Sequence, residues 1–138
     1  MPGCNLSATG INFDVDAFLK TSPWTKVASV FRRGQATGLK LRPAAKHSGL
    51  GIEISDPEED RLEPQIKSAT NFIKKNSSEL ARLTGFPGVD EVELGIGLSW
   101  FEDTAAYPLS LPPAFLFLTG KLGIAVTLYI CATTRAES

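Results

Sequence analysis

The sequence is poor in the residue types that most enzymes and metal sites use. Histidine occurs once, as His47, and cysteine twice, as Cys4 and Cys131. A zinc site needs about four thiolate or imidazole ligands, so these scattered residues predict no metal site. His47 lies in a basic, glycine-containing stretch with no nucleophile signature nearby. We therefore interpret it as an exposed loop residue and not as a catalytic base.

Motifs for phosphate binding and nucleophilic catalysis are also missing. The chain contains neither G-x-x-x-x-G-K-S/T nor G-x-S-x-G. The nearest glycine pattern, Gly95 to Trp100, lacks a third glycine and is not followed by a predicted helix. The sequence therefore predicts no nucleotide or other cofactor, no catalytic residues and no enzymatic activity.

No charge of one sign dominates, and no apolar run is long enough for a membrane span. The formal net charge of −1 gives no overall attraction to nucleic acid or acidic lipid. The most apolar stretch, Leu109 to Ala132, is interrupted by prolines, glycines and a lysine. The first ten residues, MPGCNLSATG, contain no basic segment followed by an apolar core, so we expect a cytoplasmic location.

The two cysteines argue against a secreted disulfide scaffold, which would be shorter and richer in cysteine. Both lie in apolar, strand-like sequence, which is typical of buried cysteines that act as small hydrophobes. They would come close together if the first and last strands were neighbours, and the sequence leaves this open.

The strongest pattern is a long helix followed by a strand. Apolar residues three and four apart predict one amphipathic helix from about Leu62 to Thr84, with a weak point at residues 76–78. These residues are Leu62, Ile66, Ala69, Ile73, Leu80 and Leu83. Strict alternation from Val92 to Trp100 then predicts a strand with one apolar and one polar face. Gly95 and Gly97 on its polar side predict a bulge or a close approach by another element.

The other elements complete one domain covering residues 1–138. Strands are predicted at residues 4–9, 26–33, 50–54 and 124–132, and helices at 14–21 and 113–122. The last strand is apolar on both faces, which is typical of a central strand. Residues 34–51 are mostly loop, with a few strand residues near Leu39 to Leu41. The resulting order β-α-β-β-α-β-α-β predicts an α+β two-layer sandwich, with an antiparallel or mixed sheet of about five strands and helices mainly on one face.

Charge is segregated along the chain. Residues 17–52 contain seven basic residues and no acid, whereas residues 53–63 contain six acids and one arginine. One hypothesis is that the acidic turn binds a basic partner protein together with an exposed aromatic anchor; its residues are Trp24, Asp56, Glu58, Glu59 and Asp60. The alternative is that the basic loop and the polar sheet face bind an anion or small molecule; its residues are Arg32, Arg33, Lys40 and Arg42. In a third reading, the two segments neutralise each other or face water.

Two further observations bear on these alternatives. The basic loop has no aromatic residues between its charges, which argues against RNA, because a base-stacking platform needs them. Glu91 and Glu93 point to the same side of their strand, roughly 6.5–7 Å apart. This separation suits paired carboxylates in acid–base hydrolysis, but it is also typical of a solvated strand face.

Several short stretches spread over most of the chain match a known family. They are Gly10 to Leu19, Phe31 to Gly34, Ile54 to Asp56, Gln65, Ile66, Ala69, Phe72, Ile73, Leu83 to Val89, Leu94, Leu122 to Ile124 and Tyr129. In these residues the chain resembles an uncharacterised family of small bacterial domains, a domain of unknown function with the general appearance of immunity proteins from bacterial toxin systems.

The resemblance implies the family fold and a bacterial, cytoplasmic setting, and it carries over no active site. We therefore expect a non-enzymatic interaction protein, of the kind that neutralises a toxin or effector. The polar sheet face is then either solvated or hidden in a homodimer.

Overall fold

The fold is α+β, as the sequence predicts. Over the residues that the structure describes, it has a five-stranded mixed sheet and four helices, one helix more than predicted. A computed structural model of the chain describes residues 2–34, 46–101, 106 and 108–133. The predicted strand residues near Leu39 to Leu41 lie outside these ranges. Within them, no helix combines the length and apolar character needed to cross a membrane.

The sheet is built around β1 (Gly3–Gly10), whose alternating sequence places Cys4, Leu6 and Ala8 on one face. β3 (Ser48–Glu53) and β4 (Glu91–Phe101) flank β1, and both are antiparallel to it. β2 (Ser29–Phe31) pairs with β3, while β5 (Ala125–Thr133) pairs parallel to β4. The strand order is therefore β2-β3-β1-β4-β5.

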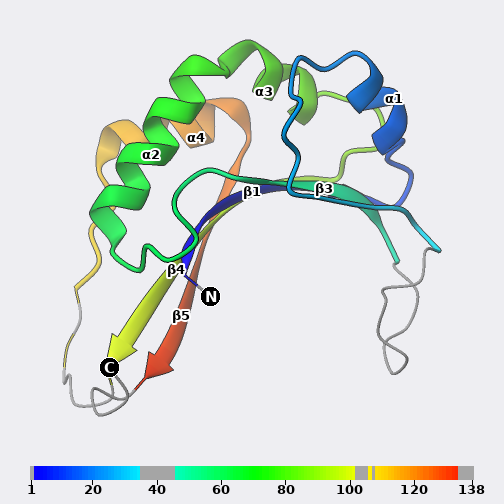
Figure 1. Cartoon of the computed structure of the whole chain (residues 1–138). Coiled ribbons are helices and arrows are strands. Elements are labelled where there is room, and N and C mark those ends of the chain that lie inside the picture. Colours follow the sequence, from blue (N-terminus) through cyan, green and yellow to red (C-terminus); the bar gives the residue numbers. More distant parts are fainter. Residues whose placement is uncertain (1, 35–45, 102–105, 107, 134–138) are drawn as a thin grey trace.

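The four helices of the described ranges all lie on one side of the arched sheet, and within these ranges its other side carries none (Figure 1). They are α1 (Val15–Lys20), α2 (Leu62–Lys75), α3 (Ser77–Thr84) and α4 (Pro113–Leu122). The last of these connects β4 to β5, because two parallel strands need a crossover.

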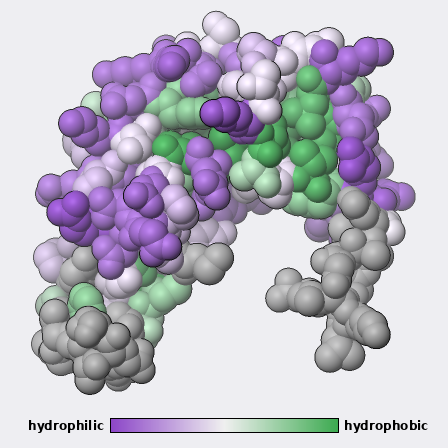
Figure 2. Space-filling model, in the orientation of Figure 1, coloured by the Kyte–Doolittle hydropathy of each residue, from purple (hydrophilic) through white to green (hydrophobic). Residues whose placement is uncertain are grey.

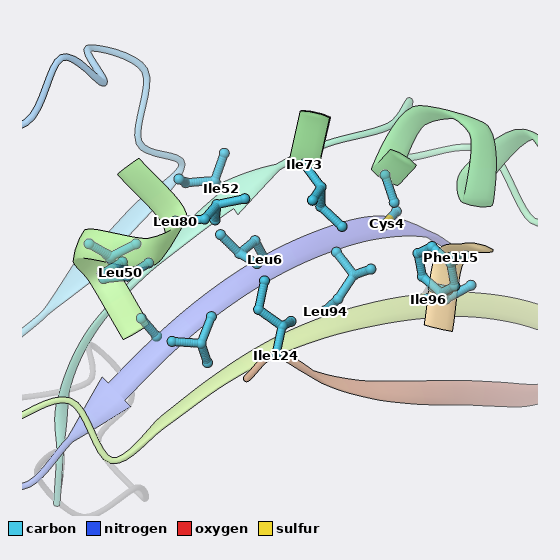
Figure 3. Packing of buried hydrophobic residues seen from close by; sticks show 14 of the residues in the cluster. Cys4, Leu6, Leu50, Ile52, Ile73, Leu80, Leu94, Ile96, Phe115 and Ile124 are labelled. Carbon is cyan, nitrogen blue, oxygen red and sulfur yellow. The ribbon is translucent and has the colours of Figure 1, made fainter. Parts of the chain in front are cut away.

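The core lies between the helices and the sheet. Apolar side chains of β1, β3 and β4 point towards the helices and meet residues such as Ile73 and Phe115 (Figure 3). Figure 2 shows the same arrangement from outside, with apolar residues gathered between the two layers and polar residues over the helices. The sheet face that contributes to the core is therefore the apolar face predicted by the strand alternation.

The predicted long helix is two helices, and the break falls at the predicted weak point. Asn76 ends α2 and precedes α3; its backbone N–H and its side-chain Nδ2 both donate to the carbonyl of Phe72. The bond from Nδ2 competes with the regular helical bond from the backbone, and two serines follow. The break turns α3 so that Leu80 and Leu83 reach the core.

Gln65 is a fully buried polar residue that fastens α2 to the sheet. Its Nε2 donates to the carbonyl of Gly97 on β4 at 2.7 Å. The same nitrogen donates to the carbonyls of Arg61 at 3.0 Å and Glu59 at 3.1 Å. One amide group therefore joins a helix, a strand and the turn that precedes the helix.

A second polar cluster fastens α1 to α3. The Arg82 guanidinium pairs with Glu79, with 2.6 Å between Nε and Oε1, and lies 4.1 Å from the centroid of the Phe18 ring. It also donates to the carbonyl of Phe18 and to the hydroxyl of Thr21. Glu79 is buried and accepts a further hydrogen bond from Ser22. Arg82 lowers the pKa of Glu79, and the bond from Ser22 acts in the same direction.

Two expectations about the strands are wrong. The last strand is not central: among the described residues, β5 is the end strand of the sheet. It therefore does not pair with β1, because β4 lies between them.

Cys4 faces the helices and Cys131 lies exposed on the other side, so the two cysteines are not neighbours. Burial raises the pKa of the Cys4 thiol to about 12, which fits the prediction that this cysteine is a buried small hydrophobe. The same prediction is wrong for Cys131, which is exposed.

The second strand is also shorter than predicted. It covers Ser29–Phe31, where residues 26–33 were expected. Its pairing with β3 is limited to three residue pairs, from Ser29 with Gly51 to Phe31 with Gly49. The backbone N–H of Ala28 still donates to the carbonyl of Gly51 at 2.8 Å, but residues 26–28 form no ladder with β3, so the β-propensity of this segment exceeds the pairing that it makes.

Candidate functional site

The helix-free face of the sheet carries the small and polar residues of each strand. The register places Asn5 and Ser7 of β1 beside Gly95 and Glu93 of β4. On the other side of β1, Ser7 lies beside Gly51 of β3. These residues follow directly from the strand alternation, which sends every second side chain away from the core.

Aromatic rings from the two outer strands border this face. The ring of Phe31 on β2 lies over Gly49, and the ring of Tyr129 on β5 lies over Gly95. A β-carbon added at Gly95 would be 2.9 Å from the Tyr129 ring, so the glycine leaves the space that the ring occupies. This is the close approach that the glycines of β4 predict.

A recess of about 420 Å³ lies between β1, β4 and β5 on this face. Its floor consists of small residues, and the side chains of Glu93 and Tyr129 stand around it. The Tyr129 hydroxyl donates a hydrogen bond to Oε1 of Glu93 across the pair of strands. The complete lining is Gly3, Asn5, Ser7, Glu93, Gly95, Gly97, Tyr129, Ile130 and Cys131.

The recess has acidic character. No lysine, arginine or histidine is among its described lining residues. The hydrogen bond to Glu93 raises the pKa of Tyr129, and the charges of Glu93 and Glu91 add to this effect. A carboxylate that already accepts one hydrogen bond has lone pairs left for further donors. The recess can therefore accept a group that carries positive charge and N–H donors.

The structure separates the two predicted carboxylates. Glu93 is half-buried and lines the recess, whereas Glu91 is exposed and lies in a smaller hollow of about 140 Å³ near Gly123. Paired acid–base chemistry needs both groups around one substrate. In this arrangement one carboxylate faces the recess, which suits binding better than hydrolysis.

The acidic turn lies at the start of α2, as predicted. Asp56 accepts a hydrogen bond from the backbone N–H of Glu58 and so closes the turn. Glu59 pairs with Arg61 at 3.3 Å, and its carbonyl accepts bonds from Gly3 and Gln65. Asp60 is half-buried, so Asp56 and Glu58 are the residues of this turn that face solvent most fully.

Trp24 is part of the edge of the core and does not belong to the acidic turn. Its half-buried ring lies 6.0 Å from both Phe18 and Phe72, and its Nε1 donates to Asn76 at 3.1 Å. Asn76 follows the last residue of α2, whereas the acidic turn precedes the first. About 20 Å of helix therefore separates the tryptophan from the acids.

Of the four basic residues proposed for anion binding, the structure describes two. Arg32 forms a bidentate contact with Asp16, at 2.7 Å and 2.9 Å, and this contact holds the pKa of the Asp16 carboxyl below its usual range. The backbone N–H of Arg33 donates to Ser48, and the residue is exposed. Lys40 and Arg42 lie outside the described residues, as does most of the basic loop.

A larger cleft, of about 810 Å³, lies between the first turns of α2 and the segment before α4. Arg61, Glu63 and Lys67 line one side and Pro108 to Ser110 the other. Charges of both signs alternate along it, so it presents no single ligand chemistry. Among the described residues, no group of three potential metal ligands comes together here or elsewhere.

Sequence reasoning missed Tyr129 as a site residue, and with it the recess. Tyr129 and Glu93 are 36 positions apart in the chain and meet because β5 pairs parallel to β4. The glycines of β4 were the available signal, since they indicated that another element approaches this face. Without the strand order, the sequence could not show that this approaching element is β5.

Comparisons of the chain with protein-family models, with curated proteins and with solved structures give no match. The resemblance to small bacterial immunity-like domains therefore stays a prediction, and the function must be argued from the site.

Proposed function

We propose that this chain is a non-enzymatic protein-interaction module that binds its partner with the helix-free face of the sheet. One observation carries the proposal: a glycine-floored recess on this face holds a half-buried carboxylate and an aromatic ring. Such a face offers a partner a broad polar surface with one recess for an anchoring side chain.

The chemistry of the recess selects a basic anchor. Glu93 provides the carboxylate, and the Tyr129 ring provides an aromatic wall beside it. An arginine side chain satisfies both, because its guanidinium forms hydrogen bonds with a carboxylate and stacks on an aromatic ring. A lysine satisfies the charge but not the planar stacking. The partner surface is therefore basic, with an arginine at its centre.

An immunity-type role is the more specific form of this proposal. In that role the chain would cover a basic active or binding surface of a bacterial toxin or effector, where complementary charge speeds encounter. The acidic turn then adds negative charge near the start of α2. The resemblance noted for the sequence supports this form, and the cytoplasm is the location in which we expect it.

Selection from a library of random displayed peptides tests the proposal. We expect the enriched peptides to contain arginine or lysine, and their affinity to fall about tenfold in the Glu93→Gln variant. The substitution preserves the size of the side chain and removes its charge. Affinity for the purified peptide is measured by isothermal titration calorimetry.

Two controls decide which surface binds. Glu53→Gln removes an exposed carboxylate on β3. Glu53 lies beside Asn5 of β1 but outside the recess, so we expect this substitution to leave the affinity unchanged. Reversing the charges of Asp56, Glu58, Glu59 and Asp60 tests the acidic turn. Enrichment of peptides without basic residues, or loss of binding in the charge reversal but not in Glu93→Gln, would contradict the recess as the binding site.

A second candidate function is the binding of a small cationic molecule. The volume of the recess supports it, because small-molecule sites typically measure about 300–1,000 Å³. A primary amine that raises the melting temperature of the chain, but not that of Glu93→Gln, would favour this function if the peptide selection gives no enrichment.

A further inference from the structure

The outer strand β5 has an unusual position for its sequence. It is nine residues long and apolar on both faces, which is typical of a strand with neighbours on both sides. Among the described residues, however, it pairs with β4 alone and ends the sheet. Ile130 is 45% exposed and Tyr129 is 50% exposed as a result.

The two edges of the sheet differ in their protection against association. At one edge, β2 is three residues long and is followed directly by Arg32 and Arg33. Short strands and flanking charges are common devices that prevent edge-to-edge pairing. β5 has neither device, since its sequence AVTLYICAT contains no charged residue, proline or glycine. Among the described residues, therefore, β2 carries devices against edge-to-edge pairing and β5 carries none.

The helix that precedes β5 also carries exposed apolar side chains. α4 packs on β5 and buries Phe115. On the same helix, Phe117 is 68% exposed and Leu116 is 46% exposed. They are two of the five large apolar side chains that stand out as exposed among the described residues, and Tyr129 and Ile130 of β5 are two more. An apolar area of this kind marks an interface.

We infer that β5 pairs antiparallel with β5 of a second copy of this chain, so that two sheets join into one of ten strands. A two-fold axis brings each strand against its own sequence, and a strand without charges opposes no like charges in this arrangement. The formal net charge of −1 adds little repulsion between two copies.

The sequence of β5 is compatible with such a pairing on both faces. With the axis at the central residue Tyr129, Leu128 lies opposite Ile130 of the second copy, and Val126 lies opposite Ala132 of the second copy. These apolar pairs are on the helix-covered face. On the other face, Thr127 lies opposite Cys131 of the second copy. Each residue thus meets one of similar polarity, and the helix-free faces of the two copies form one continuous surface.

Sedimentation equilibrium of the complete chain at micromolar concentrations tests this inference. We expect twice the mass of the chain, and an increase of about a hundredfold in the dimer dissociation constant for Ile130→Lys, because two lysines then lie close to the axis. Thr127→Lys introduces the charge on the opposite face of the same strand and should have the same effect. Circular dichroism establishes that each variant is folded.

Ile11→Lys is the matched control, since Ile11 is 47% exposed and lies after β1, outside the proposed interface. It should remain dimeric. A monomeric wild-type chain would overturn the inference and would indicate that β5 receives a different partner. A dimer that persists in both β5 variants, but dissociates in Phe117→Lys, would overturn it in favour of contact through α4.

Discussion

Replacing Gln65 with glutamate is expected to lower the free energy of unfolding by about 3–5 kcal/mol at neutral pH. The Nε2 atom that donates to the carbonyls of Gly97, Arg61 and Glu59 would become an oxygen atom. A carboxylate would then face these carbonyl oxygens in a fully buried position. The loss is largest at neutral pH because the carboxylate is ionised in the unfolded chain.

The pH dependence of this variant distinguishes charge from lost hydrogen bonds. Burial raises the pKa of a carboxyl group above its unfolded value, so the folded variant binds the proton more tightly than the unfolded chain. The loss of stability relative to wild type should therefore be smallest at low pH and grow as the pH rises above about 4.3. Gln65→Met, of similar shape and without charge, should lose about 2–3 kcal/mol with no such dependence. Urea unfolding followed by tryptophan fluorescence measures the free energy of unfolding of both variants. A Gln65→Glu chain as stable as the wild type at neutral pH would contradict the role of the Gln65 amide in joining α2 to the sheet.

Replacing Arg82 with leucine is the substitution with the second-largest expected effect, about 2–3 kcal/mol of destabilisation. The side chain of Glu79 is 10% exposed and would keep the hydrogen bond from the Ser22 hydroxyl. The ring of Phe18 would lose the guanidinium stacked on it. Because the Arg82 side chain is itself 33% exposed, the effect should be smaller than that of breaking a fully buried pair.

The sign of the pH effect follows from the lowered pKa of Glu79. A carboxyl group whose pKa is lower in the folded state stabilises the fold above its unfolded pKa and loses this contribution as the pH falls through the folded value. The difference in stability between wild type and Arg82→Leu should therefore shrink below about pH 4. Arg61→Leu removes an exposed ion pair and serves as the control with little effect. A difference independent of pH would show that the Arg82 contacts act through packing alone.

Local patterns predicted the elements of this fold well. The alternation in β4 and the spacing of apolar residues in α2 and α3 depend on near neighbours in the chain, and the structure confirms both. The break at Asn76 fell at the predicted weak point for the same reason. The polar side of β4 was likewise correct, including the close approach at Gly95.

Strand order was the part that local patterns could not supply. The sequence of β5 is that of a central strand, yet the described chain places it at an edge, because strand order depends on contacts between distant segments. For the same reason, local patterns could not predict the contact between Tyr129 and Glu93. Nor could they predict the role of Gln65, since the carbonyl of Gly97 that receives its hydrogen bond is 32 positions away.

The charged residues predicted for binding also make contacts within the fold. The segregated basic and acidic segments suggested two binding surfaces, but Arg32 contacts Asp16 and Glu59 contacts Arg61 within the fold. Trp24, the predicted anchor, packs against Phe18 and Phe72. Binding by the acidic turn stays a prediction that the charge reversal tests directly.

The central claim is that recognition takes place on the helix-free face of the sheet. Amide chemical shifts of the isotopically labelled chain, recorded during titration with the enriched basic peptide, test it most directly. The account predicts that the largest changes occur at Asn5, Ser7, Gly95, Gly97 and Tyr129, around the recess. Changes confined to the turn at residues 56–60 or to the helical layer, with none on the sheet face, would contradict it.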